Sequence, residues 1–158
     1  DKKFTENFCF HVFGQKTKQM AKAIKLLGSS YIASGIIKNK CLLYHTLVDS
    51  VISKNIIDTA KTAGLKKIIK RLSNKRLWPD SVPVKEKFER LAFEELKLAA
   101  EMDVLAAKRT LTAKGAKFGL ITKDMRKIAK QFRKLWLARN KPSRLKDNLR
   151  LFQQICKG

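Results

Sequence analysis

Carboxylates and imidazoles are the side chains of this chain that could do acid–base chemistry, and their spacing argues against it. Glu94 and Glu95 are adjacent, so on a helix they point about 100° apart and cannot flank one substrate as paired glycosidase carboxylates do. His11 has no histidine, cysteine or carboxylate at helical spacing, and we interpret both His11 and His45 as ordinary residues. Glycine-rich phosphate-binding, nucleophile-elbow and zinc-protease motifs are also absent. The sequence therefore predicts no catalytic residue, no metal site and no cofactor.

One carboxylate lies where an isolated charge would be costly. Glu95 falls within an apolar stripe formed by Leu91, Leu98 and Met102, and burial of an unpaired carboxylate is unfavourable. We expect a lysine or arginine from a neighbouring helix to pair with it. The alternative is a general acid with a raised pKa. Asp103 is the other acid in the inner half of the same helix.

The elements that would position these residues are centred on the stretch from Val84 to Leu111. At about 100° per residue, its apolar side chains fall on two nearly opposite faces, which requires neighbours on both sides. One face holds Phe88, Leu91, Leu98, Met102 and Leu105, and the other holds Phe93, Leu96, Ala100, Val104, Ala107 and Leu111. Residues 84–111 are therefore predicted to form a central helix that exposes only a narrow charged strip to water.

Helical spacing of apolar residues extends along the rest of the chain, and no stretch alternates as a half-buried strand does. The expected helices are Phe4–Phe13 capped by Thr5, Lys16–Gly35 loosened at residues 28–30, Ile36–Ile52, a helix from the cap Asn55 to Ala63 ended by Gly64, a basic helix after it, one capped by Thr122, and one from Ser143 to Cys156. The fold class is all-α: one domain, residues 1–158, in an irregular bundle of six or seven helices, with a linker-like segment at 77–83. No apolar run is long enough for a membrane span.

The charge of the chain raises the question of an anionic partner. Lys and Arg number 36 against 13 Asp and Glu, a net charge of +23. A basic patch is expected at Lys66, Lys67, Lys70, Arg71, Lys75 and Arg76, and residues 126–150 are also basic. Three readings stay open: solvated helix faces without a binding role, a nucleic-acid-binding module, and an amphipathic helix on a membrane surface.

The three cysteines, Cys9, Cys41 and Cys156, are far apart and lack metal-ligand spacing. We interpret them as buried free thiols, which favours the cytoplasm, although the compartment is otherwise unknown. The chain begins at Asp1 without an initiator methionine or signal peptide, so we expect a fragment or a processed chain.

The run from Phe132 to Asp147, which contains Trp-Leu-Ala-Arg-Asn-Lys-Pro-Ser-Arg-Leu, resembles a C-terminal signature of bacterial β-N-acetylhexosaminidases of glycoside hydrolase family 20. In that family a helix ends in Trp-Leu-x-Arg-Asn-Arg-Pro-Gly-Gly-Leu. Three further segments fall in the family's order: Phe10–Phe13, Leu26–Tyr31, and a Leu- and Ala-rich helix from Glu86 to Ala106. Ser143 and Arg144 replace the two glycines, a change that could remove a glycine-dependent turn.

The resemblance implies a helical domain that follows a catalytic (β/α)₈ barrel. Catalysis in the family is assisted by the substrate's acetamido group, with an adjacent Asp-Glu pair on the barrel. This chain has no Asp-Glu dipeptide, so the catalytic residues would belong to another part of the parent protein. Arg139, Asn140 and Arg144 are candidates for contact with the barrel, a second subunit or a ligand. The alternative for Arg139 and Asn140 is structural: Asn140 caps carbonyl groups, and Arg139 lies at the negative end of the helix dipole.

Overall fold

The computed structural model describes residues 2–14, 18–36, 47, 52–78, 86–115 and 121–155. Within these ranges the chain is all-α and has no strand, which confirms the fold class. Eight α-helices are present there, against six or seven expected. They are α1 (Lys2–Phe13), α2 (Lys18–Gly28), α3 (Ser30–Ser34), α4 (Lys54–Thr59), α5 (Thr62–Leu72), α6 (Lys87–Ala113), α7 (Ile121–Arg139) and α8 (Leu145–Ile155), with a 3₁₀ turn η3 (Lys75–Leu77) between α5 and α6.

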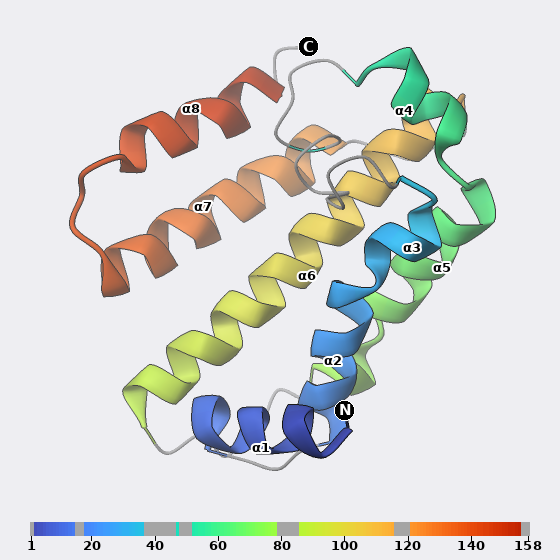
Figure 1. Cartoon of the computed structure of the whole chain (residues 1–158). Coiled ribbons are helices and arrows are strands. Elements are labelled where there is room, and N and C mark those ends of the chain that lie inside the picture. The colour runs from blue at the N-terminus through green and yellow to red at the C-terminus, as the bar shows by residue number, and fades with distance from the viewer. Residues whose placement is uncertain are drawn as a thin grey trace.

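Helix α6 runs through the middle of the bundle, as expected for the central helix (Figure 1). It packs mainly against α5 and α7, and also against α1 and α2, while α8 packs on the outer side of α7. Helix α7 runs antiparallel to α6: Asp124, near its start, pairs with Lys108, whereas Arg139, at its end, pairs with Glu95. The central helix therefore has neighbours on more than one side, which its two apolar faces require.

Burial along α6 is uneven. Nine residues from Leu98 to Leu111 are buried, whereas Phe93 is the one buried residue between Lys87 and Lys97. Phe88, expected on an apolar face that neighbours would cover, is 71% exposed. That part of the prediction is wrong, because the helical period places a side chain on a face but does not say how far the neighbouring helices extend along it.

The turn between α4 and α5 differs from the expected one. Ser53, not Asn55, caps α4, since its side chain accepts a hydrogen bond from the backbone N–H of Ile56. The chain turns at Ala60, and Gly64 lies inside α5 instead of ending a helix. A Cβ atom at Gly64 would lie 1.6 Å from the carbonyl oxygen of Ala33. Gly64 therefore allows α3 and α5 to pack closely together, whereas the sequence predicts a helix break at this position.

Other helix ends also correct the expected boundaries. Thr5 lies inside α1 and Thr122 inside α7, so neither residue is the cap that we expected. The expected loosening at residues 28–30 is a division at Ser29 between α2 and α3. The helix expected at Ile36–Ile52 lies outside the described residues except at Ile36, Leu47 and Ile52.

The expected linker begins inside the core. Leu77 and Trp78 are both buried, and the indole Nε1 of Trp78 donates a hydrogen bond of 2.7 Å to the carbonyl of Leu72. Residues 79–83 of that segment lie outside the described ranges. Across the described helices, none combines the length and the apolar character that a membrane crossing needs.

Candidate functional site

The run that carries the family resemblance forms the end of α7 and the turn into α8. Asn140 closes α7 because both its backbone N–H and its Nδ2 donate to the carbonyl of Trp136, at 2.7 and 3.3 Å. The indole of Trp136 donates in turn to the carbonyl of Lys141, at 3.0 Å. Asn140 thus has the capping role that the structural alternative predicted.

Arg144 adopts a backbone conformation that favours glycine. Its φ angle is +64°, and it is the one non-glycine residue with positive φ among those described. The family motif has its second glycine at this position. Arg144 therefore takes the left-handed conformation that glycine adopts without steric cost. Its side chain is exposed, and one guanidinium nitrogen lies 3.8 Å from the carboxylate of Asp147.

Arg139 connects the end of α7 to the first half of α6. Its Nε lies 3.1 Å from Oε1 of Glu95, and its Nη2 donates to the carbonyl of Phe88 at 3.2 Å. The prediction that a basic residue from a neighbouring helix pairs with Glu95 is confirmed. Glu95 is therefore half of an ion pair, but its side chain is 39% exposed and is not enclosed by the apolar stripe that the sequence predicts around it.

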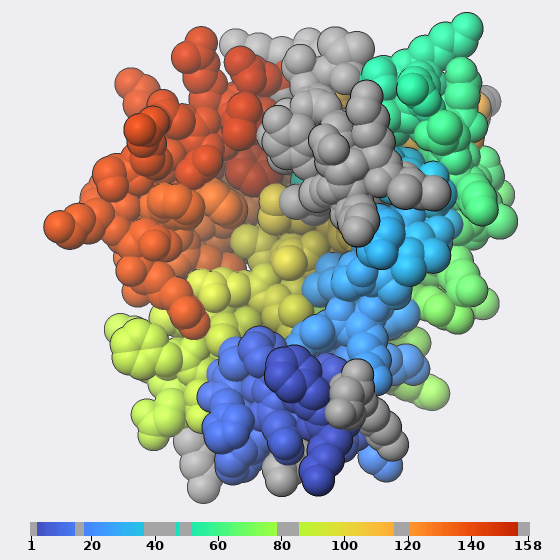
Figure 2. All heavy atoms as spheres, viewed as in Figure 1, coloured from blue at the N-terminus to red at the C-terminus, as the bar shows by residue number. Residues whose placement is uncertain are grey.

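Two exposed phenylalanines, Phe8 and Phe88, line a hollow together with this ion pair, and Phe4 is exposed one turn before Phe8 on α1. Phe4 is 69%, Phe8 43% and Phe88 71% exposed, and we call these three side chains the aromatic face. Phe8, Phe88, Glu95 and Arg139 line a shallow hollow of about 490 Å³ between α1 and α6. Figure 2 shows α1 next to the start of α6 at one end of the molecule. His11 also borders the hollow, where its ring meets that of Phe10 edge to face.

The predicted basic patch divides between two sides of α5. All six of its bases are exposed, but Lys67 and Arg71 line a small hollow against α2 and α3, while Lys75 faces α6 and α7. The apolar side of α5 is covered, since Leu65, Ile68 and Leu72 are buried in the core. The hypothesis that this helix lies on a membrane surface is therefore wrong, because it has no free apolar stripe to insert.

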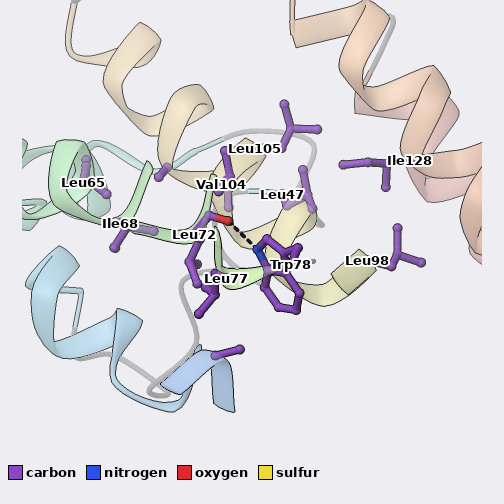
Figure 3. Packing of buried hydrophobic residues seen from close by; sticks show 14 of the residues in the cluster. Leu47, Leu65, Ile68, Leu72, Leu77, Trp78, Leu98, Val104, Leu105 and Ile128 are labelled. Carbon is purple, nitrogen blue, oxygen red and sulfur yellow. Dashed lines mark hydrogen bonds between the residues drawn. The ribbon is translucent and has the colours of Figure 1, made fainter. Parts of the chain in front are cut away.

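A larger groove of about 510 Å³ lies between η3, α6 and α7. Its apolar lining consists of Leu72, Trp78, Val104, Leu105 and Ile128, which Figure 3 shows converging from separate elements. Its polar lining consists of Lys75, Lys97, Lys108, Lys127, Glu101, Asp124 and Ser73. Lys108 and Asp124 form an ion pair at 3.0 Å. Sequence reasoning missed this groove because its lining residues extend from position 72 to position 128.

Among the described acids, Asp103 is the one whose pKa is clearly shifted. It is 4% exposed, and burial raises its pKa to about 6, although a hydrogen bond with Ser30 opposes the shift. Its Oδ2 has no hydrogen-bond partner. Asp103 lines none of the three hollows described above, so it has no place from which to act on a substrate there.

Two further predictions concern cysteine and metal chemistry. Cys9 is a buried free thiol, as expected, and burial, assisted by the charge of Glu6, raises its pKa. Cys41 and Cys156 lie outside the described residues. Within the described part of the chain, no three His, Cys, Asp or Glu side chains group closely enough to hold a metal ion.

No protein-family model matches this chain, and no match was found among curated proteins or solved structures.

Proposed function

We propose that this chain is a non-catalytic helical domain of a β-N-acetylhexosaminidase of glycoside hydrolase family 20, and that it packs on the catalytic barrel of its parent protein. The observation that carries the proposal is the backbone of Arg144. Its positive φ falls at a position where the family motif has glycine, the residue that adopts this conformation without steric cost, and this coincidence supports the resemblance.

The other motif residues support the same interpretation. Trp136 and Asn140 build the turn through their hydrogen bonds, and Arg139 fixes that turn to α6. A run whose side chains hold one turn together is typical of a structural signature. Substrate contact would instead require these side chains to line a pocket, and of the three only Arg139 borders one of the hollows.

The carboxylates of the described residues favour a non-catalytic role. Glu95 and Asp124 are paired with bases, Glu89 belongs to the capping box of α6, and Asp103 is buried away from the hollows. Glu101 borders the groove, where it has no ion-pair partner among the described residues. A family-20 enzyme needs an adjacent Asp-Glu pair at its substrate, and this chain lacks that dipeptide. The parent protein would supply the pair from its barrel.

The aromatic face is the surface that we assign to the barrel. Phe4, Phe8 and Phe88 expose large apolar area to water, and such exposed groups mark interaction surfaces in soluble proteins. Covering them would also bury the neighbouring Arg139–Glu95 ion pair more deeply. The same face could instead join two copies of the chain, an outcome that the experiment below separates.

Hydrolysis of an aryl N-acetyl-β-glucosaminide tests the proposed activity. The chain by itself should give no turnover, and the full-length gene product should hydrolyse the substrate. Hydrolysis by the chain alone that survives stringent purification would reject the proposal. A full-length product without a barrel and an Asp-Glu pair would reject it equally.

Serine substitutions test the docking face. Phe8→Ser with Phe88→Ser should leave the stability of the separate chain nearly unchanged, because both side chains are exposed. In the full-length product the same pair should loosen the helical domain and speed its release by limited proteolysis. Ile32→Ser is the matched control, since Ile32 is 62% exposed on α3 and does not line the aromatic-face hollow. A dimeric chain that the double variant makes monomeric would assign the face to a second copy instead.

A further inference from the structure

Two strongly basic elements flank a neutral helix in this molecule. Helix α5 with η3 carries six bases and no acid, and α7 carries seven bases and one acid, whereas α6 between them has five of each. The six bases of α5 and η3 are exposed, as are the bases of α7. A cleft with walls of one charge sign focuses the electrostatic potential and attracts counter-ions. The groove between η3, α6 and α7 lies between these basic elements, and four lysines line it against two acids, Glu101 and Asp124.

Each element contributes an ammonium group to this groove. Lys75 comes from η3, Lys97 from α6 and Lys127 from α7, and none of the three has an ion-pair partner within the part of the chain that the structure describes. Lys108 also lines the groove but is already paired with Asp124. The groove therefore offers three positive charges that a ligand can neutralise, and Glu101 is the one acid of the lining not paired with a base.

The floor of the groove is apolar and formed by the core. Leu72, Val104, Leu105 and Ile128 are all buried core residues, and Trp78 is held by its hydrogen bond to the Leu72 carbonyl (Figure 3). A ligand that uses the whole groove must therefore place anionic groups at the lysines and flat or apolar groups against the floor. A single-stranded nucleic acid has both, because its phosphates are charged and its unpaired bases are free to contact apolar side chains.

We propose that this groove binds single-stranded nucleic acid, with phosphates at Lys75, Lys97 and Lys127 and bases against the apolar floor. A duplex keeps its bases stacked inside and can use only the lysines, so it should bind more weakly here. The groove is separate from the aromatic face, since the two hollows share no lining residue. This site therefore does not depend on the hexosaminidase assignment.

Fluorescence anisotropy with a labelled oligothymidylate of about 15 nucleotides tests the site, since single strands of this length span one compact binding module. Wild-type chain should bind, and log K should fall linearly with log salt by about 0.7 for each phosphate contacted. The triple variant Lys75→Gln, Lys97→Gln and Lys127→Gln should lose at least about 10-fold in affinity at 0.1 M salt, with a salt slope smaller by about 2.

A matched triple variant controls for net charge. Lys54→Gln, Lys87→Gln and Lys146→Gln removes the same three charges from exposed positions that do not line the groove, and it should lose much less affinity. Equal losses in the two triple variants would overturn the proposal, because the charge would then act over the whole surface. No binding by the wild type at 50 mM salt would also overturn it.

Tryptophan fluorescence locates the bound strand. In the variant Trp136→Phe, Trp78 is the remaining tryptophan, and oligothymidylate should change its emission because it lines the groove. Poly-glutamate of the same length supplies the charge without bases and should bind more weakly and leave Trp78 unchanged. Equal binding by poly-glutamate, or tighter binding by the matching duplex, would show that the apolar floor is unused and reject a single-strand site.

Discussion

The two halves of α6 belong to one continuous helix but differ in composition and in surroundings: six of the eleven residues from Lys87 to Lys97 are charged, against four of the fourteen from Leu98 to Leu111. From Leu98 to Leu111 the helix is enclosed by the core, whereas from Lys87 to Lys97 most residues are only partly buried and Phe88 is 71% exposed. The two halves also differ in the surroundings of their acids: Asp103 is buried and has no ion-pair partner among the described residues, whereas Glu95 is paired with Arg139. The comparison teaches that one continuous amphipathic pattern can serve as core at one end and as an available surface at the other.

Truncation of a side chain in the enclosed half should have the largest effect. Leu111 has no exposed area, so Leu111→Ala should lower the free energy of unfolding by about 3 kcal/mol through lost burial and an unfilled cavity. Phe88→Ala, in the accessible half, should change it by less than about 0.5 kcal/mol. Urea denaturation followed by circular dichroism measures both. Similar losses in the two variants would erase the distinction between the halves.

The buried acid should make stability depend on pH. Because burial raises the pKa of Asp103 from 3.8 to about 6, the folded chain holds this proton more tightly than the unfolded chain. Its contribution to stability therefore declines as pH rises from 3.8 to about 6 and stays lost above that. Asp103→Asn should raise the free energy of unfolding by up to about 3 kcal/mol at pH 8 and have little effect at pH 3.5. A stabilisation that is the same at both pH values would contradict this account.

The turn between α7 and α8 follows Arg139, which pairs with the first half of α6, and a substitution there should give a smaller gain in stability. Arg144→Gly should stabilise the chain by about 1 kcal/mol, because glycine adopts positive φ without the steric cost that a side chain pays. Thermal unfolding should show a higher midpoint. Arg144→Ala is the control: it removes the same exposed guanidinium but keeps the steric cost, so it should bring no gain.

The ion pair of the accessible half should have the smallest effect. Glu95→Gln removes the charge that faces Arg139, and both side chains are more than a third exposed, so the loss should be about 0.5 kcal/mol. High salt should reduce the difference between this variant and the wild type. A loss above about 2 kcal/mol would place Glu95 in the same class as the enclosed residues.

Helical periodicity was sufficient to predict the fold class, the central helix and the buried face of α5. It also predicted that Glu95 needs a basic partner, because the cost of an isolated charge can be read from one helix. It could not identify that partner as Arg139, which lies 44 positions later, since pairing between helices depends on how they pack.

Two residues show why the sequence alone could not predict other parts of the structure. Gly64 was expected to end a helix because glycine disfavours helices, yet it fits inside α5 where Ala33 leaves no space for a side chain. The sequence predicts Lys75 as part of a continuous basic patch. In the fold, Lys75 instead lines a groove together with residues more than 20 positions away in the sequence. In both cases the deciding contact comes from a segment that is distant in sequence.

The buried thiol of Cys9 offers a way to measure how often α1 separates from the bundle. The thiol is fully enclosed and its pKa is raised, so alkylating reagents should reach a reactive thiolate only when α1 separates from the bundle. Two of the three phenylalanines of the aromatic face, Phe4 and Phe8, are on this same helix. A protein that binds these two side chains would keep α1 packed on the bundle. The rate of iodoacetamide labelling at Cys9 would then fall in proportion to the fraction of chains with that protein bound.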